Sequence, residues 1–314
     1  MAVGSPEVTL FEKSRPRLEA IAYRLLGSAS DAEDAVQDTW LRWRSADHAH
    51  VETPEAWLTK VLTNICLNLL ASARARRETY VGQWLPEPVL AGDRMLGPSE
   101  TAEQRESVSV AMLTLMERLL ANERVVYVLR EAFGHTHAEI AGVLGLTEAN
   151  CQQIYRRAKQ HLGSDRVRVE VDASGARKIV EEFLAAAHSG NTDSLVKLLS
   201  DDVITAGDAG GVFASLPRPI TGALRVARFL RSLLTPDDAK REMVGGRPSL
   251  FAEVVNGMPA LVLVVDGRVV VVMSFEVTTE GVAAVHIQAN PAKLARATRR
   301  WATAEHGELL AEAW

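Results

Sequence analysis

The sequence predicts a multidomain protein in which two all-α helical domains are followed by an α+β domain. Three observations support this fold class. At 314 residues and about 150 residues per domain, the chain is long enough for two or three domains. Apolar residues recur at helical spacing through most of residues 8–162, whereas after residue 172 they gather in short β-branched runs. The third observation is a stretch rich in glycine and proline, residues 78–100, which breaks the helical part into two.

The first domain, residues 6–78, reads as three helices. The apolar pattern that starts at Phe11 stops at Gly27, a residue typical of a helix C-terminus. Ser30-Asp31-Ala32-Glu33 fits a capping box, so a second helix is expected to begin there. Pro54 follows a threonine N-cap and is suited to the first turn of a long third helix, which ends in a cluster of arginines.

Two polar faces in this domain are candidates for binding. The outer face of the second helix concentrates carboxylates with no nearby lysine; its members are Asp31, Asp34, Gln37, Asp38 and Leu41. This face is either solvated or contacts a basic protein partner. The third helix carries short amides and then cations, namely Asn64, Asn68, Arg74, Arg76 and Arg77. These are either solvated groups and a favourable interaction with the helix dipole, or a nucleic-acid surface.

Residues 79–104 are expected to form a flexible linker, and residues 105–164 a second helical domain. Within it, Gly145 permits a tight turn between two short helices and Thr147 caps the second, so the segment from His137 to Leu162 predicts a helix-turn-helix. Cys151, Tyr155, Ala158 and Leu162 would face inward. The outward residues suit base edges and phosphates: Asn150, Gln152, Gln153, Arg156, Arg157 and Lys159. The alternative is an ordinary helical hairpin with a solvated polar face.

Residues 175–294 predict one amphipathic helix packed on a curved antiparallel sheet. Asp266-Gly267 between two valine-rich runs is a strong hairpin signal. Residues 295–314 are expected to form a C-terminal tail that packs back on another domain through apolar residues at roughly helical spacing.

Composition excludes several classes of protein. The net charge of −5 argues against attraction of the whole molecule to nucleic acid or anionic lipid, so local clusters must carry any such function. No apolar run approaches the ~20 residues that span a bilayer. Cys66 and Cys151 lack the spacing of a disulfide framework or a metal site, and we expect no metal, no cofactor and no catalytic residue. Without a leader pattern at the N-terminus, we expect a cytoplasmic protein.

The helical part resembles a known family. The run from Asp31 to Trp43, then Pro54-Glu-Ala-Trp-Leu58, the arginine cluster, a linker and a helix-turn-helix are similar to bacterial extracytoplasmic-function sigma factors. The resemblance implies that the acidic helix docks on the β′ clamp helices of core RNA polymerase. It also implies that helix 54–77 takes the −10 element of promoter DNA and that helix 148–162 enters the major groove at the −35 element.

The match narrows to the SigJ-like subgroup, in which a cone-shaped α+β barrel of the SnoaL/NTF2-like class is fused to the sigma domains. Tyr80-Val-Gly-Gln-Trp-Leu-Pro-Glu-Pro88 resembles its linker motif and Asn290-Pro-Ala-Lys-Leu294 its NPDKL motif, whereas its DGGGK motif survives only as Asp208-Ala-Gly-Gly-Val212. The resemblance implies regulation in cis through Trp84, Leu85, Pro86, Asp208, Asn290, Pro291 and Lys293. It also implies a small-molecule ligand in the C-terminal domain.

We therefore expect an alternative sigma factor that directs transcription initiation and is regulated by its own C-terminal domain. One alternative is a ligand-responsive helix-turn-helix regulator, although such a protein needs neither the acidic helix nor the arginine-ended one. A less favoured alternative is a SnoaL-type isomerase or cyclase that uses Asp208 and His286 as an acid/base pair.

Overall fold

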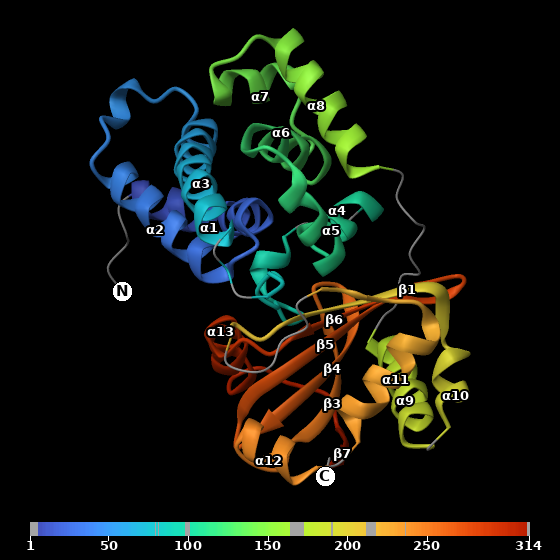
Figure 1. Cartoon of the computed structure of the whole chain (residues 1–314). Helices are drawn as coiled ribbons and strands as arrows, with labels where there is room; N and C mark the ends of the chain where they lie inside the picture. The colour runs from blue at the N-terminus through green and yellow to red at the C-terminus, as the bar shows by residue number, and fades with distance from the viewer. Residues whose placement is uncertain are drawn as a thin grey trace. The chain divides into compact units, whose positions relative to one another are not determined.

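The computed structural model describes residues 6–78, 80, 82–97, 101–163, 173–189, 191–211, 218–235 and 237–312. The chain forms two compact units (Figure 1). The helical unit comprises Met1–Thr79, Gly92–Val108 and Met112–Ser164. The C-terminal unit comprises Tyr80–Ala91, Ser109–Ala111 and Asp165–Trp314. Within the described residues, none of the helices is both long and apolar enough to cross a membrane.

The helical unit begins with α1 (Pro6–Leu26), α2 (Ala29–Arg44), the short η1 (His48–His50) and α3 (Pro54–Glu78). The first helix ends as the sequence predicts, since Gly27 adopts a φ of 66°. The predicted capping box at residues 30–33 is wrong. Ser28 is the N-cap of α2, and its hydroxyl accepts a hydrogen bond of 3.1 Å from the backbone N–H of Asp31. Ser28, directly after the left-handed Gly27, starts the helix two residues earlier than predicted, so Ser30 is already helical.

The second half of the unit contains η2 (Arg94–Leu96), α4 (Ala102–Glu106), α5 (Val110–Leu115), η3 (Met116–Arg118), α6 (Ala121–Glu131), α7 (His137–Leu144) and α8 (Glu148–Leu162). The last two helices form the predicted helix-turn-helix. Gly145 ends α7 with a φ of 67°, a conformation that costs other residues strain, and Thr147 caps α8. Helix α6 packs against α1 and α3, and α7 against α3, so the two sequence-predicted helical domains form one compact unit here.

Two buried arginines join the halves of this unit. The Arg24 side chain on α1 donates hydrogen bonds to the backbone oxygen of Leu96 (2.6 Å) and the hydroxyl of Ser107 (2.7 Å). The Arg124 side chain on α6 donates to the backbone oxygen of Arg24 at 3.2 and 3.3 Å. Burial lowers the pKa of Arg124 to about 9 and that of Arg24 to about 10, so each guanidinium is held at a cost in desolvation. Both buried guanidinium groups therefore depend on these hydrogen bonds to offset the cost of desolvation.

The C-terminal unit is an α+β domain, as the sequence predicts. Its sheet has the order β2-β1-β6-β5-β4-β3-β7, and β1 and β6 are parallel whereas the other neighbours are antiparallel. The strands are β1 (Leu199–Asp208), β2 (Ile220–Thr221), β3 (Ser249–Val255), β4 (Met258–Val265), β5 (Arg268–Thr278), β6 (Gly281–Gln288) and β7 (Leu309–Glu312). The helices are α9 (Ala173–His188), α10 (Thr192–Val196), α11 (Ala223–Leu234), α12 (Asp238–Val244) and α13 (Pro291–Trp301).

The sheet is covered on both faces. One face packs α9, α10 and α11 around an apolar core that includes Phe183, Leu230 and Phe275. The other face packs α13 through Leu294 and Trp301 (Figure 1). Asp266 and Gly267, both with positive φ, form the predicted hairpin turn between β4 and β5.

The structure differs from the predicted flexible linker and from the predicted boundary between the last domain and the tail. Residues 85–90 are buried within the C-terminal unit, and Leu90 joins the core on the α13 face. The tail boundary predicted after residue 294 falls inside α13, and residues 309–312 pair with β3 as an edge strand. The reason is the same in both cases: one face of the sheet is apolar, and α13 and the segment before Ala91 supply the side chains that cover it.

Candidate functional site

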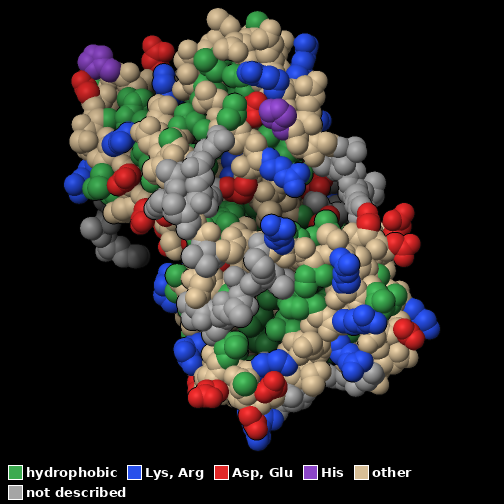
Figure 2. Space-filling view, viewed as in Figure 1, with side chains coloured by type: hydrophobic (Ala, Val, Ile, Leu, Met, Phe, Trp, Pro, Cys, Tyr) green, Lys and Arg blue, Asp and Glu red, His purple; other side chains and the backbone are tan. Residues whose placement is uncertain are grey.

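The first candidate surface is the outer face of α2. Asp34, Gln37 and Asp38 are exposed, Leu41 is 43% exposed beside them, and Asp31 is half-buried at the start of the helix. Within the described part of the chain, none of the three aspartates forms an ion pair. Figure 2 shows acidic, basic and hydrophobic side chains mixed over the first helices. We call the surface formed by Asp34, Gln37, Asp38 and Leu41 the acidic face; it combines negative charge with one exposed apolar contact.

The second candidate surface lies on α3. Asn64 and Asn68 are exposed one turn apart, as predicted, while the opposite side of the helix buries Leu58, Leu62 and Ile65. The side chains of Arg74, Arg76 and Arg77, in the last turns of α3, lie outside the described residues. The structure therefore places the two amides of this surface at exposed positions.

The third candidate surface is the outward face of α8. The exposed residues are those predicted, namely Asn150, Gln153, Arg156, Arg157 and Lys159. Gln152 is half-buried, and its amide donates to the carboxylate of Glu148 at 3.4 Å. Ile154 takes the inward place that the sequence assigned to Tyr155, which is half-buried and hydrogen-bonded through its hydroxyl to Glu131.

A fourth site is formed where the segment before Ala91 docks in the C-terminal unit. The backbone of Val89 pairs with Asn256, whose N–H donates to the Val89 oxygen at 2.8 Å and whose side-chain oxygen accepts from the Val89 N–H at 3.0 Å. The Ala91 N–H donates to the oxygen of Val254 at 3.0 Å. Leu85 is only 2% exposed. We call residues 82–91 the docked segment.

Asp208, at the end of β1, is the centre of this fourth site. Its carboxylate accepts four hydrogen bonds: Oδ1 from the Tyr80 hydroxyl (2.6 Å) and the Gly210 N–H (3.0 Å), and Oδ2 from the Leu85 N–H (3.0 Å) and Lys293 Nζ (2.6 Å). Two of these donors belong to the chain before Ala91. Burial, and then the hydrogen bond to the Asp208 carboxylate, raise the pKa of the Tyr80 hydroxyl. Tyr80 therefore stays protonated and donates.

Lys293 links the docked segment to α13. Besides Asp208, its ammonium group donates to the backbone oxygen of Leu85 at 2.6 Å. It lies 4.3 Å from the ring centre of Trp84 and 5.0 Å from that of Tyr80, within the range of cation–π attraction. Asn290 donates to the Tyr80 hydroxyl at 2.8 Å and caps α13 through the N–H of Ala292. The predicted regulatory residues of the linker and the C-terminal domain thus meet at one place, apart from Pro291, which contributes the first turn of α13.

The turn after Asp208 requires a glycine at position 210. A Cβ atom there would lie 2.5 Å from Cγ of Asn290, and the residue has a φ of +60°. Any side chain would displace Asn290 and, through it, Tyr80.

Asp208 and His286 lie on neighbouring strands, two residues apart in register. In the parallel register of β1 and β6, Ala206 is opposite His286 and Asp208 is opposite Gln288, so the two side chains are offset along the sheet. Among the described residues, no cluster of three or more histidines, cysteines or acids could hold a metal ion. Cys66 and Cys151 are both buried and unbridged.

Sequence reasoning missed two residues of the fourth site. Asn256 binds the docked segment, and the Gln288 amide donates to the backbone oxygens of Leu85 (3.4 Å) and Pro86 (3.2 Å). Asn256-Gly257 is itself a hairpin signal that would have located the turn between β3 and β4. Nothing in the sequence pattern indicates that either side chain faces the linker.

Comparison with known proteins identifies both helical modules. The model of the family described as Sigma-70 region 2 matches residues 10–76, and that of Sigma-70, region 4 matches residues 109–162. The sequence is 39% identical over 229 residues to the ECF RNA polymerase sigma factor SigJ of Mycobacterium tuberculosis, covering 73% of each chain. It is 27% identical over 301 residues to a probable ECF sigma factor, SigI, of the same species, covering 94% of this chain and 97% of that one.

The fold agrees along most of the chain. The crystal structure of M. tuberculosis SigJ superposes with a TM-score of 0.71 at 31% identity, covering 92% of this chain and 98% of that one. The match therefore includes the C-terminal α+β domain as well as the helical modules, which confirms the predicted fold class. The chain belongs to the extracytoplasmic-function family of RNA polymerase sigma factors, and within it to the SigJ-like factors that carry a SnoaL/NTF2-like C-terminal domain.

Proposed function

We propose that this sigma factor binds core polymerase through the acidic face of α2 and reads promoter DNA through α3 and α8. The carboxylates of the acidic face would repel DNA phosphates, which favours a basic protein surface such as the β′ clamp helices. Asn64 and Asn68 face solvent, as residues that contact an opened −10 element must. On α8, Asn150 and Gln153 have the amide chemistry that reads base edges, and the cations further along suit phosphates at the −35 element.

We also propose that the C-terminal domain regulates the factor in cis through the docked segment. The observation that carries this proposal is the Asp208 carboxylate, which binds the chain on both sides of the helix-turn-helix in sequence: Tyr80 and Leu85 before it, Gly210 and Lys293 after it. Docking thus ties the chain segment that connects the two helical modules to the C-terminal sheet, so a change in one can alter the other. The same contacts favour a non-catalytic domain, because they occupy the one carboxylate proposed for chemistry. A small-molecule ligand in this domain, and action in the cytoplasm beside polymerase, remain predictions from the sequence.

Reconstitution with core polymerase tests the first proposal. Asp34→Lys combined with Asp38→Lys should abolish co-purification with core enzyme and promoter-dependent initiation, while leaving the circular dichroism spectrum unchanged. Asp201→Lys is the matched control, because this exposed aspartate lies on β1, outside the helical unit. Retention of core binding by the double variant would refute the assignment of the acidic face.

The cis-regulatory proposal is tested in the same assay by undocking the segment. Tyr80→Phe removes one hydroxyl that bridges Asp208 and Asn290, and it leaves the acidic face and α8 untouched. A change in initiation rate without a change in core binding supports regulation through the docked segment. If a variant with an undocked segment initiated transcription at the wild-type rate, the proposal of regulation through the docked segment would be contradicted.

A further inference from the structure

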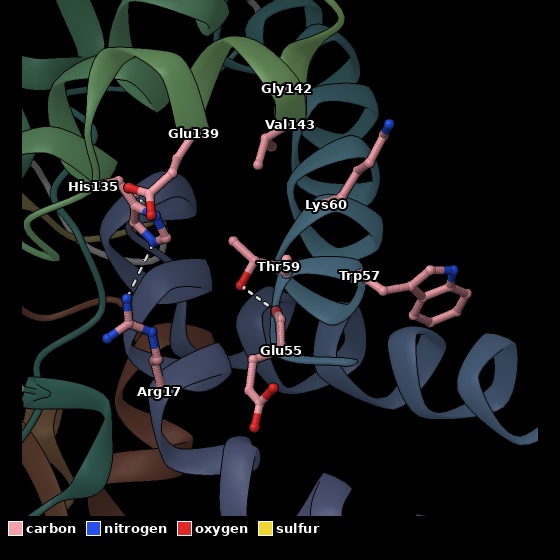
Figure 3. Close-up of a pocket in the computed structure, with 10 residues that line it drawn as sticks. Arg17, Glu55, Trp57, Thr59, Lys60, His135, Glu139, Gly142 and Val143 are labelled. Carbon is pink, nitrogen blue, oxygen red and sulfur yellow. Dashed lines mark hydrogen bonds and ion pairs between the residues drawn. The ribbon is translucent and has the colours of Figure 1, made fainter. Parts of the chain in front are cut away.

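A solvent-open cavity of about 600 Å³ lies in the helical unit, between the first helices and the helix-turn-helix (Figure 3). Its walls come from α1, from the first turns of α3, from the turn between α6 and α7, and from α7. Six of its lining residues are Arg17, Glu55, Thr59, His135, Glu139 and Val143. The cavity carries both signs of charge, so it does not select a cation or an anion. It does bring solvent to the contact between α1 and the helix-turn-helix.

That contact is made by His135 and Arg17. Nη2 of Arg17 on α1 lies 3.1 Å from Nε2 of His135, in the turn between α6 and α7, and the two side chains point toward each other in Figure 3. A guanidinium can only donate, so Nε2 must be the acceptor and the imidazole must be neutral. The Arg17 guanidinium also lies 5.3 Å from the ring centre of Phe133. Protonation of His135 removes the acceptor and places two cations in contact.

The charges that face His135 from each neighbouring element do not offset this repulsion. On α7, the Glu139 carboxylate is 3.8 Å from Nδ1, but it is 61% exposed and already accepts from the backbone and hydroxyl of Thr136. On α6, Arg130 adds a third cation, which donates to the backbone oxygen of His135 at 3.0 Å. On α3, Glu55 and Lys60 line the cavity with opposite charges.

Burial, and then the Arg17 charge, lower the pKa of His135, whereas Glu139 raises it by less. A histidine freed from these neighbours titrates near pH 6.5. Because the closed unit binds the proton less tightly than an opened one, the closed unit is favoured at higher pH. This preference is lost as the pH falls below about 6.5. Each unit of difference in pKa between the two forms changes the opening equilibrium about tenfold.

We propose that His135 is a proton-sensitive contact that holds the helix-turn-helix against α1 in the helical unit and weakens that hold when its imidazole is protonated. This inference concerns the conformation of the helical unit, so it stands or falls separately from the proposed promoter and polymerase contacts.

Single-molecule energy transfer on the full chain tests the inference. Dyes on Arg42→Cys in α2 and Gln160→Cys in α8, both exposed positions, report the separation of the two modules. The native cysteines are buried and should not be labelled. The sequence isoelectric point is about 6.0, so picomolar dilution is needed to avoid association during a titration from pH 8 to pH 5. We expect a population with lower transfer efficiency to grow as the pH falls, with a midpoint at or below 6.5.

Three variants in the labelled background decide the outcome. His135→Gln keeps a neutral acceptor for Arg17 and should hold the pH 8 distribution throughout the titration. Arg17→Gln removes the repelling cation but not the burial of His135, so it should reduce the response without abolishing it, which keeps the test decisive if His135→Gln fails to fold. His50→Gln, at an exposed histidine beside Asp47, is the matched control and should respond as the parent does. Equal distributions at pH 8 and pH 5 would overturn the inference, as would a His135→Gln protein that keeps most of the response.

Discussion

Replacing Asp208 by asparagine should release the docked segment. The change is nearly isosteric, so the sheet loses no volume. A carboxamide offers one oxygen where the carboxylate offers two, and both oxygens of Asp208 accept two bonds each. If the remaining oxygen stays on Tyr80 and Gly210, the new NH₂ group faces the N–H of Leu85 and the ammonium of Lys293, where only an acceptor is tolerated.

The expected cost follows from the two contacts that depend on docking. The Leu85 N–H is buried and loses its partner, which costs about 1–3 kcal/mol. The Tyr80 hydroxyl exchanges a charged acceptor for a neutral one and loses about 1 kcal/mol more. The bond between Lys293 and Asp208 lies within the folded domain and persists without docking, so it is left out of the sum. A total of about 2–4 kcal/mol corresponds to a roughly 30- to 900-fold rise in the undocked fraction.

Limited proteolysis measures this fraction. Thermolysin cleaves beside large apolar residues, and the docked segment contains Leu85, Val89 and Leu90, which are buried while it is docked. When opening and closing are fast, the cleavage rate follows the open population. Asp201→Asn is the matched control, since it makes the same chemical change at an exposed position of β1. Thermal unfolding followed by circular dichroism separates undocking from loss of the fold.

A double-mutant cycle with Tyr80→Phe sharpens the test. Tyr80 and Asp208 share a hydrogen bond, so the combined change should cost less than the sum of the single changes. Cleavage of Asp208→Asn at the parental rate would refute the role of the carboxylate as the organiser of the docked segment. Strictly additive effects would show that Tyr80 contributes through other contacts.

Three further outcomes are expected. Gly210→Ala should expose the segment to thermolysin as Asp208→Asn does, because its methyl group would lie 2.5 Å from Cγ of Asn290; an unchanged cleavage rate would contradict this. Gln153→Ala should weaken binding by about 1–3 kcal/mol at one base position of the −35 element. Arg157→Ala should instead weaken binding to every sequence and reduce the slope of its salt dependence by about one unit. Binding titrations on a promoter library measure both effects. Burial raises the pKa of Cys66 to about 12, so the folded chain at pH 8 should resist thiol reagents and urea should restore the reaction, as monitored by mass spectrometry.

Local rules explain most of what the sequence predicts correctly. Gly27 and Gly145 end helices because glycine adopts positive φ cheaply, and Asp266-Gly267 forms a hairpin turn for the same reason. The exposed faces of α2, α3 and α8 follow from apolar periodicity alone, which identifies the opposite, buried side of each helix. The missed α11 has the same kind of periodicity, with Val226, Ala227, Leu230 and Leu234 buried.

What the sequence leaves out depends on tertiary contacts. Glycines and prolines in residues 78–100 correctly exclude a helix, but they do not indicate whether an extended segment is solvated or docked. Docking is decided by side chains far away in sequence, such as Asn256 and Gln288. A tertiary contact also explains why Ile154, and not Tyr155, faces inward on α8. The Tyr155 hydroxyl donates a hydrogen bond to Glu131 on α6, so the tyrosine ring stays at the edge of the core.

The compact helical unit is smaller than the distance between the two promoter elements that it is proposed to contact. A compact body of about 150 residues has a radius of gyration of about 15 Å, and hence a diameter of about 40 Å. Elements centred near −10 and −35 are about 25 base pairs apart, which is about 85 Å along the duplex. If α3 reads one element and α8 the other, the packing of α6 and α7 on α1 and α3 must break. The Arg124 bonds to the Arg24 carbonyl and the contact between Arg17 and His135 then determine how readily both elements can be engaged at once.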